Sequence, residues 1–98
     1  MTYIRLSVAR PRTGETSEHL VSLFRELGQL TAGQEGCLQS YLLKPHDDSG
    51  DIARIVMYSD EKAAERAAGG EAIMALRSQL DLIIDPRSHR ERAFFTID

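Results

Sequence analysis

The sequence has one cysteine, no long apolar run and no excess of basic residues, and each absence excludes a class of protein. Because Cys37 stands alone among the 98 residues, no disulfide can form within the chain. No apolar stretch approaches the roughly 20 residues that a transmembrane helix requires. The first ten residues contain Arg5 and Arg10 and lack the apolar segment of a secretory signal. We therefore expect a cytoplasmic protein without a membrane span.

The charge balance argues against nucleic acid as the main partner. The chain carries 12 basic and 15 acidic residues, whereas phosphate binding requires a clustered basic surface. The most basic run, residues 87–92, is interrupted by Glu91, and we interpret it as a solvated loop and strand edge.

Four segments have the composition or the alternation of β-strands, and we expect strands at residues 2–9, 37–44, 52–58 and 90–97. Pro11 ends the first strand because proline lacks a backbone donor and disfavours helical geometry in the residue before it. The turn-forming residues 45–50 are too few for a crossover and predict a hairpin between the second and third strands.

Apolar residues at steps of three and four predict two helices. The first begins after a capping turn at residues 13–17, ends near Gly33, and places five apolar side chains on one stripe: Leu20, Leu23, Phe24, Leu27 and Leu30. The second begins at residues 59–61 and is interrupted at Gly69-Gly70, because each glycine costs about 1 kcal/mol inside a helix. This break would serve either as a hinge that admits a ligand or as a fixed bend.

The order β-α-β-β-α-β predicts an α+β, ferredoxin-like fold, with both helices on one face of an antiparallel sheet. The second, third and fourth strands carry apolar residues on both faces. A chain of this size buries only roughly 65% of its unfolded surface. We therefore expect a homodimer in which the sheet of a second copy covers the apolar face that the helices leave open.

Two segments give this plan a family likeness. Residues 34–41 (Gln-Glu-Gly-Cys-Leu-Gln-Ser-Tyr) lead into the second strand, and residues 54–64 (Arg-Ile-Val-Met-Tyr-Ser-Asp-Glu-Lys-Ala-Ala) join the third strand to an alanine-rich helix. In these segments and in its element order the chain resembles the antibiotic biosynthesis monooxygenase family of dimeric α+β barrel proteins. The resemblance extends over residues 1–98, which we expect to form a single domain.

The resemblance implies a reaction and a site. The family includes oxygenases that convert polycyclic phenols to quinones without metal or flavin, in a pocket between sheet and helices. Tyr58 stands where the family usually has tryptophan, Arg54 stands where some quinone-forming members have asparagine, and Arg77 matches an arginine of the second helix. We therefore expect cofactor-independent oxidation of a small hydroxylated aromatic or a quinol, with Arg54, Tyr58 and Arg77 in the site.

Other family members bind and degrade haem through a histidine on the second helix. The equivalent positions here are Ala67 or Glu71, so the resemblance does not favour haem. The alternative function is a non-enzymatic homodimeric module of the same fold that binds a small ligand or has a structural role.

Each candidate residue also has a structural interpretation. Arg54 could pair with a carboxylate of a second copy in the dimer interface, Tyr58 could pack in the core or interface, and the stem of Arg77 could lie along the apolar stripe.

The remaining reactive side chains predict no metal site. His19, His46 and His89 lack ligand spacing, although His89 precedes the fourth strand in a loop that could close over a pocket mouth. Cys37 has no basic neighbour in the sequence, so we interpret it as a small buried hydrophobic residue.

Overall fold

The structure is a computed structural model that describes residues 1–97, and every expected element is present in it. In chain order the elements are β1 (Tyr3–Ala9), α1 (Ser17–Ala32), β2 (Cys37–Leu43), β3 (Ile52–Tyr58), α2 (Glu61–Ala68), α3 (Glu71–Ile83) and β4 (Arg90–Phe95). The expected break in the second helix is confirmed, because α2 ends before Gly69 and α3 begins after Gly70. The fourth strand ends at Phe95, two residues earlier than expected.

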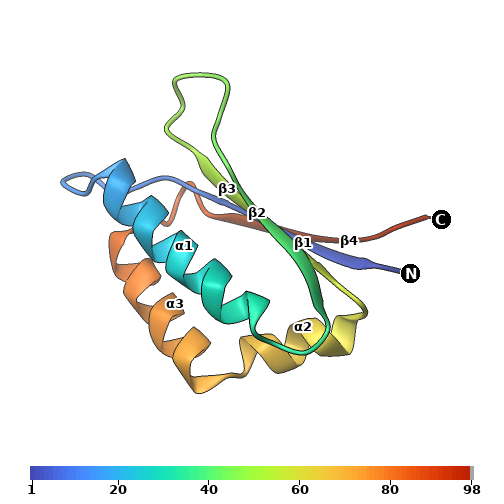
Figure 1. Cartoon of the computed structure of the whole chain (residues 1–98). Coiled ribbons are helices and arrows are strands. Elements are labelled where there is room, and N and C mark those ends of the chain that lie inside the picture. Colours follow the sequence, from blue (N-terminus) through green and yellow to red (C-terminus); the bar gives the residue numbers. More distant parts are fainter. Residues whose placement is uncertain (98) are drawn as a thin grey trace.

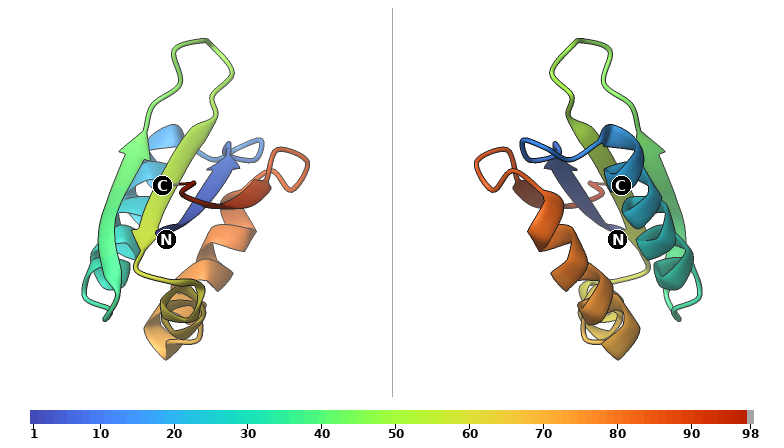
Figure 2. Two further views of the ribbon diagram at one scale, coloured as in Figure 1. Left: turned by 90° about the vertical axis from the view of Figure 1, so that its right-hand side faces the viewer. Right: turned by 90° about the vertical axis from the view of Figure 1, so that its left-hand side faces the viewer.

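The strands form one antiparallel sheet in the order β2-β3-β1-β4, which is the ferredoxin-like arrangement. The helices cover one face of this sheet, with α1 and α3 lying next to each other (Figures 1 and 2). No helix within residues 1–97 is long and apolar enough to span a membrane.

Local contacts explain where two of the helices begin. The Thr16 side chain accepts a hydrogen bond from the backbone N–H of His19 at 3.1 Å, and Asp60 accepts one from Ala63 at 2.8 Å. Gly36 allows α2 to approach the chain closely, because it has a positive φ of 87° and an added Cβ would lie 2.5 Å from the Cβ of Ala63. A side chain at this position would therefore displace α2 from the end of the sheet.

The two faces of β1 have opposite character, and the polar one faces the helices. Arg5 pairs in register with Val56, which is 1% exposed, and Ser7 pairs with Arg54. The core is formed by apolar side chains of the three helices together with the ends of β1 and β3: Ala9, Leu20, Leu23, Phe24, Leu27, Ile52, Val56, Tyr58, Ala63, Ala64, Ala67, Ile73, Leu76, Leu80, Ile83 and Ile84. Polar groups are therefore enclosed near the middle of the sheet, beneath the helices.

The opposite face of the sheet, which we call the bare face, has no cover within residues 1–97 and is largely apolar, except at the β4 edge, where Arg90 and Arg92 pair with Val8 and Leu6. Ile4 pairs with Met57 and Phe94 on its two neighbouring strands, and Leu6 pairs with Ile55. Phe94 is 40% exposed. An apolar stripe thus crosses the sheet on the side away from the helices.

Candidate functional site

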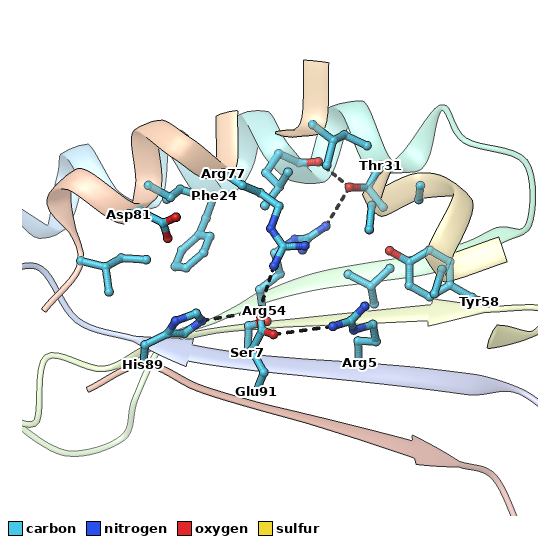
Figure 3. Close-up of a pocket in the computed structure, with 18 residues that line it drawn as sticks. Arg5, Ser7, Phe24, Thr31, Arg54, Tyr58, Arg77, Asp81, His89 and Glu91 are labelled. Carbon is cyan, nitrogen blue, oxygen red and sulfur yellow. Dashed lines mark hydrogen bonds and ion pairs between the residues drawn. The ribbon is translucent and has the colours of Figure 1, made fainter. Parts of the chain in front are cut away.

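A cavity of about 60 Å³ lies between the sheet and the helices, and much of its wall is polar. The side chains of Arg5, Arg54 and Tyr58 reach it from β1 and β3, and Arg77 reaches it from α3 (Figure 3). The structure thus brings the three predicted site residues to a single cavity. A volume of about 60 Å³ holds a few water molecules, but it is smaller than the roughly 150 Å³ of an engineered cavity that binds benzene.

Arg54 is a largely buried cation with incomplete partners. Its Nη2 donates a hydrogen bond to Oγ1 of Thr31 at 2.8 Å, and this hydroxyl donates in turn to the carbonyl oxygen of Leu27 at 2.8 Å. The buried Nε of Arg54 has no hydrogen-bond partner among residues 1–97. Burial is the main influence on the pKa of Arg54 and lowers it. The nearby Tyr58 acts to raise this pKa, and Arg77 acts to lower it further. Because buried charges in proteins are normally paired, an anionic or oxygen-bearing ligand would complete this site.

Tyr58 places a neutral phenol beside this cation. The residue is 5% exposed, and burial raises the pKa of its hydroxyl above the ordinary value, while Arg54 acts in the opposite direction. The hydroxyl can both donate and accept a hydrogen bond, and the ring offers an aromatic surface to the cavity.

A carboxylate on β4 lies close to two arginines and one histidine of the wall. Glu91 lies 3.3 Å from Nη2 of Arg77, 3.6 Å from Nη2 of Arg5 and 3.5 Å from Nε2 of His89. These pairs are partly exposed, so each contributes little to stability, but together they connect α3 to the sheet at the edge of the cavity (Figure 3).

Five further residues that line the cavity were not predicted from the sequence: Arg5, Ser7, Thr31, Asp81 and Glu91. The available signal was that Arg5 and Ser7 share one side of the first strand. Finding Glu91 beside them required the pairing of β4 with β1, which puts Glu91 opposite Ser7.

The structure also bears on the structural interpretations of Arg54, Arg77 and Cys37. Arg54 lies on the helix-covered face, which argues against its placement in an interface on the bare face. The head group of Arg77 reaches Glu91 from α3, so Arg77 lies at the edge of the cavity and not only along the apolar stripe. Cys37 is half-buried, and burial raises the pKa of its thiol, which fits a small hydrophobic residue.

His89 contributes to the cavity wall, as its position before the fourth strand suggested. His19 is exposed and contacts Glu15, and His46 is exposed in the hairpin loop. Within residues 1–97 no three His, Cys, Asp or Glu side chains are grouped as a metal site would require. Of the positions equivalent to a haem-binding histidine, Ala67 lies in the cavity wall and Glu71 is exposed at the start of α3.

A ferredoxin-like sheet with a polar cavity beneath its helices defines the structural class, and the sequence identifies the family. Residues 3–78 match the profile of the antibiotic biosynthesis monooxygenase family, and the chain therefore belongs to that family. Among curated proteins none matches the sequence.

Solved structures share the fold at low sequence identity. SnoaB, described as a cofactor-independent oxygenase from Streptomyces nogalater, is 15% identical with a TM-score of 0.86, covering 99% of this chain and 94% of its own. Rv0793 from Mycobacterium tuberculosis is 17% identical with a TM-score of 0.85, covering 100% and 97%. PA3566 from Pseudomonas aeruginosa is 18% identical with a TM-score of 0.83, covering 99% and 95%. At these identities the likeness establishes a monooxygenase-like fold.

Proposed function

We propose that this protein is a homodimeric, cofactor-independent oxygenase that oxidises a small hydroxylated aromatic or a quinol whose oxygen reaches the cavity beneath its helices. One observation carries the proposal. Arg54 is a buried guanidinium with an unpartnered Nε, and it faces the cavity that Tyr58 and Arg77 also line. Family membership and the SnoaB-like fold are consistent with this chemistry.

The chemistry begins with transfer of a proton from the substrate to solvent water. A cation beside the resulting phenolate lowers the pKa of the phenol, and a site of low dielectric strengthens that interaction. The electron-rich ring then gives electrons to dioxygen, which is the co-substrate, and a carbon–oxygen bond forms. Loss of water completes the change, so that an anthrone and dioxygen yield an anthraquinone and one water molecule. One oxygen atom enters the product and the other leaves as water.

The three residues have different proposed roles. Arg54 holds the deprotonated oxygen, because no carboxylate within residues 1–97 neutralises its charge at salt-bridge distance. Tyr58, kept neutral by burial, donates a hydrogen bond to an oxygen of the substrate. Arg77 adds positive potential at the edge of the cavity while Glu91 fixes its position.

The bare face of the sheet supports the dimer. Its apolar stripe includes Ile4, Leu6, Ile55 and Met57, and it crosses neighbouring strands without a cover from residues 1–97. The matching face of a second copy is complementary in character and would remove these side chains from water.

A second candidate function is a non-enzymatic dimeric module that binds a small molecule or has a structural role. The small cavity favours it, because about 60 Å³ does not admit an aromatic ring without rearrangement.

Oxidation of a panel of anthrones and naphthoquinols under air separates the two functions. We expect oxygen uptake and quinone absorbance to rise above the buffer rate with the unaltered protein and to fall to that rate with Arg54→Met. Tyr58→Phe should retain binding but lose part of the rate. Ligand binding without any acceleration would support the non-enzymatic module, and a Soret band shift on addition of hemin would point to haem instead.

A further inference from the structure

A second hollow reaches Arg54 from the side opposite Arg77. It is a groove of about 320 Å³ between α1 and β2, which we call the α1–β2 groove. Its wall consists of five residues of α1, three of β2 and Arg54 of β3. Phe24 and Arg54 also line the inner cavity, so these two side chains form the partition between the two spaces.

The two spaces differ in size and in chemistry. The inner cavity contains the guanidinium groups and the Tyr58 hydroxyl but has only about 60 Å³ of room. The groove is about five times larger and presents the apolar side chains of Phe24 and Leu42. A ring that does not fit in the first space fits in the second, and its oxygen substituent would then point to Arg54 at the partition.

Gly28 borders this groove. It lies in the interior of α1, where a glycine destabilises a helix relative to alanine. Its backbone needs no glycine, because φ is not positive and an added Cβ would find no atom within 4 Å. The missing side chain instead leaves open space on the side of α1 that borders the groove.

We propose that the α1–β2 groove holds the apolar ring system of the ligand whose oxygen reaches Arg54, and that Gly28 determines how large that ring system can be. This inference depends on the site proposed above but concerns binding, so it can be tested without turnover. The occupant is the remainder of the same small molecule, because Arg54 is common to both walls and its buried Nε lacks a partner.

The test uses 1-naphthol as the probe, measured by isothermal titration calorimetry with the full chain under nitrogen so that oxidation does not occur. We expect Gly28→Leu to weaken binding by at least about tenfold, because the new side chain occupies the space of the ring. Ser22→Leu serves as the matched control and should stay within about twofold of the unaltered protein. It adds the same leucine side chain to an exposed position of α1 outside the groove wall.

Ala32→Leu gives an independent second test, because Ala32 lines the groove one helical turn beyond Gly28. It should weaken 1-naphthol binding as well. The inference would be overturned if Gly28→Leu and Ala32→Leu both left the affinity unchanged, or if the unaltered protein did not bind 1-naphthol. A change of assembly mass in Gly28→Leu would overturn it as well. If 1-naphthol binding depends on Gly28 but the oxidation assay shows no activity, only the proposed reaction is rejected. Oxidation that is indifferent to Gly28→Leu would reject only the groove.

Discussion

Replacing Arg54 by methionine should stabilise the ligand-free protein while it removes ligand binding. Methionine retains the apolar stem of the side chain, ends near the position of Nε, and has no charge and no Nε to leave unpartnered. An unsatisfied buried polar group costs about 1–3 kcal/mol, and moving a guanidinium out of water costs more. Against this stands the lost hydrogen bond to Thr31, worth about 1.5–3 kcal/mol for a charged donor.

The balance favours methionine by about 1 kcal/mol, because the Thr31 hydroxyl keeps its own bond to the Leu27 carbonyl and burial, which lowers the pKa of Arg54, outweighs the opposing effect of Tyr58. For a chain of this length that gain raises the Tm by about 4–8 °C. A structural arginine in a complete buried pair behaves in the opposite way, since breaking such a pair costs about 3–5 kcal/mol.

The assay is thermal and urea unfolding of both proteins at pH 7, at one fixed protein concentration because the proposed dimerisation would contribute to apparent stability. Calorimetric titration with 1-naphthol runs in parallel. A higher Tm together with lost binding would support the view that Arg54 serves ligand binding and lowers the stability of the fold. A fall in Tm of more than about 4 °C would show that Arg54 is structural and would refute the reasoning.

Three further predictions concern single positions. Gly28→Ala should stabilise the protein by about 0.5–1 kcal/mol in urea unfolding, because a helix favours alanine and the added Cβ meets open space; a loss of stability would show that the site is crowded. The raised pKa of Tyr58 means that its contribution to stability is complete below the ordinary pKa near 10 and is lost as the pH rises from there through the folded-state value. Tyr58→Phe should therefore lose less stability than the unaltered protein in alkaline titrations followed by circular dichroism, and parallel curves would contradict this. Ile55→Lys should yield monomers in light scattering at micromolar concentration, because it places a charge on the bare face, and an intact dimer would show that the interface lies elsewhere.

The sequence predicted the elements well because their signals are local. The Ile52–Tyr58 strand, the stripe from Leu20 to Leu30 and the break at Gly69-Gly70 each depend on residues that are neighbours in the chain. The need for glycine at position 36 is also partly local, because the backbone there has a positive φ. Its close approach to Ala63, in contrast, is a tertiary contact.

The site was predictable only where the family likeness pointed to it. Arg54, Tyr58 and Arg77 were selected in this way, and the structure brings them to one cavity, although their catalytic roles stay a prediction. The cluster around Glu91 could not be predicted, because it depends on the register of strands that lie far apart in the sequence. Periodicity showed that β1 has a polar side but not that this side faces the helices.

The most direct test is the pKa of 1-naphthol when it is bound to the protein. Ultraviolet absorbance distinguishes the phenol from the phenolate, so titration of the bound and free forms gives both values. Stabilisation of the phenolate by Arg54 predicts a bound pKa at least about one unit below the free one, which corresponds to about 1.4 kcal/mol, and loss of that difference in any Arg54→Met protein that still binds. A bound pKa equal to or above the free value would contradict a site built to hold a deprotonated aromatic.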